Sequence, residues 1–229
     1  MGIPFIVPGS QTFIPNSVID LRERFPQPTP KPRQTLSPAA QCTVLYHLLS
    51  GNLANTPLNE IARRVRYSPT MLTKVKDELE AAKICKIIQN GRALMLDFKA
   101  SGRPLWDQVK PALSSPVKKS VWVQSDASGQ PVLLAGMSAL SLRTMIADDR
   151  LPTYALPHDT FEDFLKRGVC ADCQDAENAT ARMEVWCYDP KLLGDDRIVD
   201  PLSLYLSLEH SADERVQQQL EQLIEGVKW

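Results

Sequence analysis

The stretch from Thr56 to Phe98 places the tightest limits on the fold of this chain of 229 residues. It begins with two segments in which apolar residues recur three and four positions apart, the spacing of one face of an amphipathic helix. Thr56 with Pro57 and Ser68 with Pro69 each resemble a capping side chain followed by proline at the first helical position. The expected buried stripes are Leu58, Ile61, Ala62 and Val65 in the first helix and Leu72, Val75, Leu79 and Ala82 in the second. Two short helices joined by a tight turn are therefore predicted.

Two apolar runs follow, over residues 84–88 and 93–98, with Asn90-Gly91 between them. Asn-Gly between apolar runs is the strongest short-range signal for a β-hairpin, so we predict the turn at this pair. A further helix is expected upstream, from the Ser37-Pro38 cap to about Ser50. Helices followed by a hairpin in this order are typical of a winged helix-turn-helix, which reads DNA with the second helix of the motif.

The face opposite the apolar stripe of the second helix is the predicted DNA-reading surface. Its hydroxyl and amine groups can bond to phosphates or to base edges in the major groove. Arginines before the helix and cations on the hairpin are expected to hold phosphates. The predicted DNA-binding residues are Arg63, Arg64, Arg66, Ser68, Thr70, Thr73, Lys74, Lys86 and Arg92.

The charge of the reading helix argues against strong DNA binding by the helix itself. From Pro69 to Ala82 there are two lysines and three acids, so the affinity for DNA has to come from the flanks of the helix. A winged helix that contacts only protein is the alternative interpretation.

Charge divides the chain into two halves. Residues 1–103 contain 14 Lys/Arg and 7 Asp/Glu, a net charge of +7, whereas residues 104–229 contain 12 and 20, a net charge of −8. The basic half is expected to bind double-stranded DNA, and the acidic half a protein partner or a second copy of the chain.

Strand and helix patterns alternate in the acidic half, which indicates an α/β or α+β domain. The predicted class is thus α+β, with an N-terminal winged helix-turn-helix domain and a C-terminal mixed α/β domain. The predicted segments are a proline-rich arm over 1–36, the DNA-binding domain over 37–102, a connecting helix over 103–115 and the partner-binding domain over 116–229.

The sequence contains no apolar run long enough for a membrane span and no signal peptide, so a cytoplasmic protein is expected. Five cysteines fit a reducing compartment. Cys170 and Cys173 have the spacing of a zinc or redox pair, but the expected setting is a polar loop and no second pair matches. They are interpreted as incidental thiols, and no metal or cofactor is predicted.

Catalysis is not predicted either. Two-metal chemistry needs clustered carboxylates, but Asp148-Asp149 and Asp195-Asp196 lie in expected loops. Glu184 lies on the clearest strand but lacks the lysine that a restriction-type nuclease site needs two positions later. No nucleophile elbow, Walker loop or dinucleotide motif occurs. An enzyme in the C-terminal domain remains the least favoured alternative.

Three apolar segments of the C-terminal half resemble those of AbiEi-type antitoxins. They are Gly136-Met-Ser-Ala-Leu-Ser-Leu, Glu184-Val-Trp-Cys-Tyr-Asp-Pro, and Val199-Asp-Pro-Leu-Ser-Leu-Tyr-Leu-Ser-Leu with the following Asp213-Glu-Arg-Val. The resemblance covers about residues 37–229. It implies a winged helix that represses its own operon, and a C-terminal domain whose partner is a nucleotidyltransferase-like toxin of a type IV toxin–antitoxin system. A DNA-binding transcriptional regulator that acts as an antitoxin is therefore the expected function.

Overall fold

The structure is a computed structural model that describes residues 5–7, 11–13, 35–51, 53–125, 130, 132–195 and 197–229. The chain divides into two compact units, 1–34 and 35–229. In the first unit, β1 (Phe5–Val7) pairs antiparallel with β2 (Gln11–Phe13). The other residues of this unit, which make up most of the predicted proline-rich arm, lie outside the described residues.

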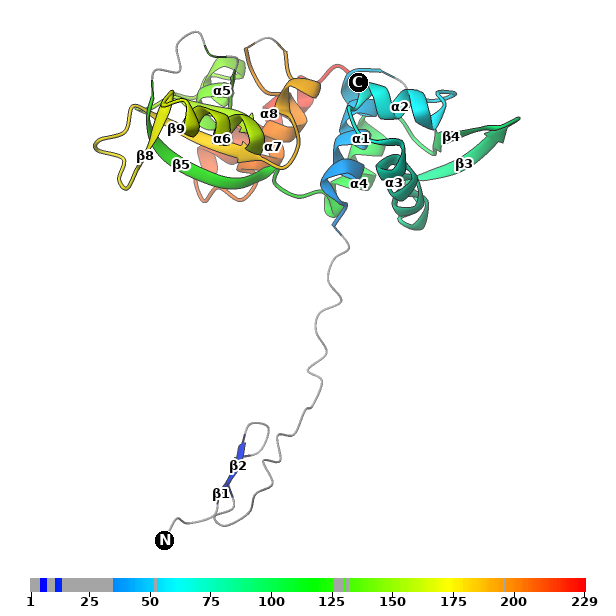
Figure 1. Ribbon diagram of the computed structural model, residues 1–229, viewed down its shortest axis with the longest axis horizontal. Helices are drawn as coiled ribbons and strands as arrows, with labels where there is room; N and C mark the ends of the chain where they lie inside the picture. Colours follow the sequence, from blue (N-terminus) through cyan, green and yellow to red (C-terminus); the bar gives the residue numbers. More distant parts are fainter. Residues whose placement is uncertain are drawn as a thin grey trace. The chain divides into compact units, whose positions relative to one another are not determined.

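The second unit begins with three helices and a hairpin (Figure 1). These elements are α1 (Pro38–Leu49), α2 (Leu58–Arg64), α3 (Pro69–Ala81), β3 (Cys85–Asn90) and β4 (Ala93–Phe98), followed by α4 (Gly102–Val109) and η1 (Lys110–Ala112). Two of the three expected caps are present, because the hydroxyls of Ser37 and Ser68 accept hydrogen bonds from the backbone N–H groups of Ala40 and Met71. These bonds satisfy donors that the first turn of a helix leaves free.

The expected cap at Thr56 is wrong. Pro57 is the N-cap of α2 and offers no side-chain bond, while Thr56 is buried. The reason is long-range, since Pro57 forms an isolated antiparallel β-bridge with Met95 of β4. At the end of α3, Ala82 also departs from the expected stripe, because it lies just beyond the helix and is exposed.

The turn of the hairpin lies one residue later than expected. Asn90 is the last residue of β3 and pairs with Ala93, so Gly91 and Arg92 form the two-residue turn. Gly91 has φ 59°, and Arg92 does not share a positive φ, the pattern of a type II′ turn with glycine at its first central position. The glycine of the Asn-Gly pair thus determines the register of the hairpin.

A five-stranded sheet dominates the rest of the unit, with strand order β6-β7-β9-β5-β8. The strands are β5 (Val117–Ser125), β6 (Leu133–Leu134), β7 (Thr153–Pro157), β8 (Cys170–Cys173) and β9 (Ala181–Trp186). Strands β7 and β9 run parallel, and the other neighbours are antiparallel. The helices are α5 (Gly136–Arg143), α6 (His158–Lys166), η2 (Pro190–Leu192), α7 (Pro201–Leu208) and α8 (Glu214–Glu225). The protein is therefore of mixed α+β class.

The sheet has a separate core on each face. Phe161 and Phe164 of α6 pack with Met183 and Val185 of β9, together with residues of β5. Trp186 belongs to the other core, which includes residues of α5, α7 and α8. This alternation follows from the two-residue period of a strand.

The second core extends beyond the sheet into the three-helix part. Leu45 of α1 and Leu72 of α3 belong to the same buried cluster as Leu140 of α5 and Leu220 of α8. The parts on either side of the expected boundary near residue 115 therefore share one hydrophobic core. In the described part of the chain, no helix combines the length and apolarity that crossing a membrane requires.

Candidate nucleic-acid interface

Helix α3 has one buried and one exposed face. Leu72, Val75 and Leu79 are at most 1% exposed, so they form the buried face of the helix. Thr70, Met71, Thr73 and Lys74 are exposed on the first two turns, as is Ser68 at the cap. The period of 3.6 residues thus presents the expected polar residues on one side of the helix.

Two hydroxyls of this face already bond to the helix itself. Ser68 Oγ accepts from the Met71 N–H at 3.2 Å, and Thr73 Oγ1 donates to the Pro69 carbonyl at 3.1 Å. A hydroxyl has one donor and two acceptor positions. Ser68 therefore keeps its donor for a phosphate, whereas Thr73 keeps only acceptor capacity unless its internal bond breaks.

Lys74 is the free cation of α3. It is exposed, and in the described part of the chain it forms no ion pair or hydrogen bond. The other lysine of the helix, Lys76, lies 2.6 Å from Asp77 Oδ1. Of the two lysines, Lys74 is therefore the one available to an anionic ligand.

Arg63 and Arg64 share one carboxylate. Arg63 Nη2 lies 2.5 Å from Glu60 Oε2, and Arg64 Nε lies 3.3 Å from Glu60 Oε1. Exposed pairs of this kind contribute about 0–1 kcal/mol, so a phosphate can displace Glu60 at small cost. Until then, Glu60 neutralises part of the positive charge that the sequence suggested.

Arg66 lies in the turn between α2 and α3 with φ 56°. Its N–H donates to the Arg63 carbonyl, and the Tyr67 N–H donates to the Ala62 carbonyl, the two bonds of a Schellman motif. Glycine usually occupies this left-handed position because a Cβ is strained there. The Arg66 guanidinium also pairs with Asp189, which follows β9.

The hairpin contributes two further cations. Lys86 on β3 and Arg92 in the turn are both exposed. Lys86 lies directly across from Asp97 in the strand register, whereas Arg92 is at the tip. The nine predicted residues thus all belong to the segment from α2 to the tip of the hairpin, with exposed cations both before and after α3 in the chain.

Sequence reasoning missed the contact that holds α3 on α1. Glu78 of α3 accepts two hydrogen bonds from Ser37, one from its N–H and one from its hydroxyl, both at 2.6 Å. This carboxylate caps α1 from another helix. No local pattern links residues 41 positions apart.

His47 of α1 has a structural role. Its Nδ1 accepts from the Leu53 N–H at 3.0 Å, and its ring stacks on Phe98 of β4 with centroids 3.9 Å apart. Burial lowers the pKa of His47 to about 4, because the charged ring would lose its water. The neutral ring therefore joins α1 to the base of the hairpin.

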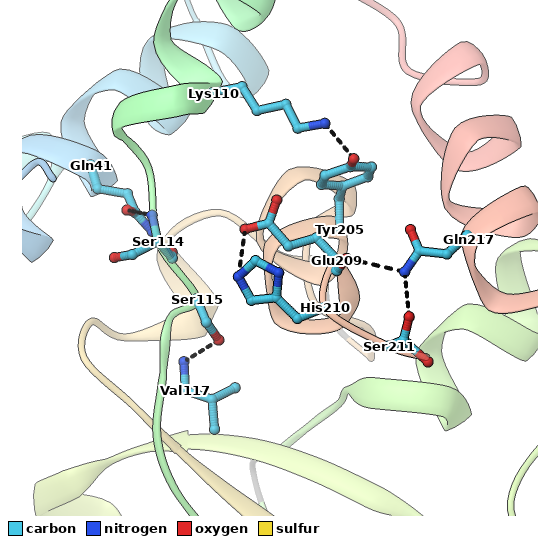
Figure 2. A network of polar contacts seen from close by, with 10 residues as sticks. All are labelled: Gln41, Lys110, Ser114, Ser115, Val117, Tyr205, Glu209, His210, Ser211 and Gln217. Carbon is cyan, nitrogen blue, oxygen red and sulfur yellow. Dashed lines mark hydrogen bonds and ion pairs between the residues drawn. The ribbon is translucent and has the colours of Figure 1, made fainter. Parts of the chain in front are cut away.

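Polar contacts extend from α1 to the segment around Ser114 and between η1, α7 and α8 (Figure 2). The Gln41 amide of α1 bonds twice to the backbone of Ser114, donating at 2.8 Å and accepting at 2.9 Å. Lys110 donates to the hydroxyl of Tyr205 of α7 and lies 4.4 Å from the centre of its ring. Gln217 of α8 donates to the carbonyls of Glu209 and Ser211, which follow α7. The Gln41–Ser114 bonds join α1 to the acidic half, and the shared core connects α3 to it.

The cysteine pair does not lie in a loop as expected. Cys170 and Cys173 are the ends of β8, an edge strand that pairs with β5. Residues three apart on a strand point to opposite faces, and Cys170 is buried in the α6 core while Cys173 is half-buried. One cation therefore cannot meet both thiols in this arrangement.

Carboxylates do not gather in the described part of the chain, where no three His, Cys, Asp or Glu side chains are placed to hold a metal. Glu184 is the buried acid of β9, and it accepts from Trp186 Nε1 at 3.1 Å. Burial raises the pKa of Glu184, which favours the neutral acid. It has the surroundings of a structural carboxyl within the core.

The geometry therefore consists of an exposed polar helix face, cations in the neighbouring elements and a hydrophobic core shared with the acidic α+β half. Comparison with protein-family models, with curated proteins and with solved structures found no match for this chain.

Proposed function

We propose that this protein is a sequence-specific DNA-binding transcriptional regulator. In this proposal α1, α2, α3 and the β3–β4 hairpin form a winged helix-turn-helix, with α3 as the reading helix and the hairpin as the wing. The observation that carries it is the exposed face of α3 with its free Lys74, which is preceded in the chain by the exposed arginines of α2 and the α2–α3 turn and followed by the exposed cations of the hairpin.

The part of the DNA that each side chain is proposed to contact follows from the chemistry of that side chain. Guanidinium groups match phosphate oxygens with paired donors, so Arg63, Arg64 and Arg66 hold the DNA backbone. The early turns of a recognition helix approach base edges, which gives Thr70 and Lys74 the reading role. Lys86 and Arg92 contact backbone phosphates beside the groove.

We further propose that the acidic half binds a cognate protein, as an autoregulating antitoxin of AbiEi type would bind a nucleotidyltransferase-like toxin. Two observations support this extension. Residues 104–229 carry a net charge of −8, which disfavours nucleic acid as the partner of that half. The shared core also connects the acidic half to α3, so binding of a partner to that half can affect the reading helix.

Salt-dependent binding of the full chain to duplex DNA tests the proposal. Each neutralised phosphate contributes about −0.9 to the slope of log affinity against log salt. The variant Arg63→Ala/Arg64→Ala should make about two fewer phosphate contacts, so its slope should be less steep than that of wild type. The matched variant Lys166→Ala/Arg167→Ala removes two exposed cations at the end of α6 and should leave the slope unchanged. Equal slopes for all three proteins would contradict the proposed site.

A second candidate is a protein-interaction module that uses the same face. The acids of α3 and the pairing of Glu60 with two arginines favour it, because they reduce the positive charge of the surface. Binding of the proposed protein partner without binding of any duplex would select this candidate.

A further inference from the structure

We infer that α3 reads thymine methyl groups in addition to the base that Lys74 contacts, with Met71 as the side chain that meets them. This inference rests on the proposed function and specifies which base feature the α3 face recognises.

The side chains best suited to hydrogen-bonded base reading are missing from α3. Guanine is read most often by arginine, and adenine by asparagine or glutamine with paired hydrogen bonds. The helix sequence PTMLTKVKDELEA contains none of the three. Lys74 remains for one guanine or phosphate, which is too little to specify a site of several base pairs.

Methyl groups take their place on the first two turns. Met71 is 39% exposed, and Thr70 and Thr73 are exposed on the same two turns of the helix. Thr73 uses its hydroxyl proton for the Pro69 carbonyl, so its methyl is the part free to meet a base. Threonine methyls and other apolar groups recognise the C5-methyl of thymine, which projects into the major groove.

The core of the protein does not need the side chain of Met71. Single exposed apolar residues are ordinary on protein surfaces, so exposure alone carries little weight. However, Leu72, Val75 and Leu79 already close the core side of α3 at no more than 1% exposure. Met71 also lies in the first turn, the part of a recognition helix nearest the base edges.

The surrounding charge selects DNA as the occupant of this surface. The apolar side chain of Met71 lies on the same helix as the free Lys74, directly after the turn that carries Arg66. Phosphates on both sides of a major groove complement such cations, whereas an apolar protein surface does not. The inferred ligand is therefore a duplex with thymines at the positions facing the first turn of α3.

Deoxyuridine substitution isolates the methyl group. A preferred duplex is first selected from a random pool with the full chain, and each thymidine is then replaced in turn by deoxyuridine. The substitution removes only the C5-methyl and keeps base pairing. We expect one or two positions at which wild-type affinity falls about fourfold, the effect of losing one buried methyl.

The same duplexes are then measured with Met71→Ala, which should bind the thymine form less tightly and be insensitive to deoxyuridine at one of those positions. Met145→Ala is the matched control, because Met145 is 97% exposed and lies after α5. It should behave as wild type. A preferred duplex whose affinity no deoxyuridine changes would overturn the inference and leave the proposed function intact. Failure to select any preferred duplex would instead overturn the proposed function.

Discussion

Arg66 Nη1 lies 3.3 Å from Asp189 Oδ2, which links the turn between α2 and α3 to the segment that follows β9. The two residues are 123 positions apart. A cation expected to hold a phosphate is thus paired with an acid of the opposite half of the chain. In the proposed function, Asp189 therefore competes with DNA for Arg66.

Asp189→Asn should therefore strengthen DNA binding. Asparagine keeps a side-chain oxygen that can accept from the Lys191 N–H, as Asp189 does now, but it removes the charge that holds Arg66. We expect affinity for duplex DNA to rise about twofold to fivefold at low salt, the range of a surface ion pair. In an Arg66→Ala background the same change should have no more than a small effect. Equal gains in both backgrounds would show that Asp189 acts by general repulsion.

Arg66→Gly should separate stability from binding. A non-glycine residue at φ 56° is strained, and glycine removes the strain at some cost in chain entropy. We expect the free energy of unfolding to rise by up to about 1 kcal/mol while DNA affinity falls. Denaturant titration and binding of the same protein measure the two quantities. Lys83→Gly, at φ 60° after α3, is the control for the stability gain.

Glu78→Ala should loosen α3 from α1. It removes the acceptor of two 2.6 Å hydrogen bonds from Ser37, and bonds to a charged group contribute about 1.5–3 kcal/mol. We expect a loss of about 1–3 kcal/mol in stability and weaker DNA binding because α3 is displaced. Glu80→Ala removes the same charge from an exposed position two residues later and should change stability little. Equal stability of the two variants would show that the Ser37 contact contributes nothing.

The local features of the fold were predictable from the sequence. The Ser37 and Ser68 caps and the exposed face of α3 depend on spacings within a few residues, so capping chemistry and helical periodicity suffice. Strand β8 was missed because Cys-Ala-Asp-Cys shows neither apolar alternation nor β-branched residues. Its place in the sheet comes from pairing with β5, nearly 50 residues earlier.

Long-range contacts explain the other differences. Pro57 replaces Thr56 as the cap of α2 because Pro57 bridges to Met95. The pairing of Arg66 with Asp189 depends on the shared core, which no local pattern reveals. For the candidate site, the sequence identified exposed side chains but not the carboxylates that partner the arginines. The role of the exposed side chains in DNA binding stays a prediction.

Acid should destabilise the fold through His47. Its folded pKa of about 4 lies below the usual 6.5, so between these values the unfolded chain binds a proton that the folded chain excludes. The free energy of unfolding should therefore fall as pH drops from about 6.5 to about 4. Burial raises the pKa of Asp200 and of Glu184, which acts in the opposite direction, so the comparison is with His47→Asn. The advantage of wild type over this variant should shrink across that window, and a constant advantage would contradict the assignment.

Lys74 and Arg92 allow a proposed base contact to be compared with a proposed contact to a backbone phosphate. Lys74 is on the exposed face of α3, whereas Arg92 is at the tip of the hairpin, where it can reach backbone phosphates. Losing a base contact costs about 1–3 kcal/mol on the preferred site and less on random DNA. Losing a phosphate contact weakens both about equally.

The most direct test measures the ratio of affinities for a preferred and a scrambled duplex at one salt concentration. The duplexes are drawn from the promoter region of the gene and from its shuffled sequence, and the full chain is used throughout. Lys74→Ala should collapse the ratio, while Arg92→Ala should lower both affinities and preserve it. If Lys74→Ala preserves the ratio, or if wild type prefers no promoter duplex, α3 is not the reading helix of a DNA-binding regulator.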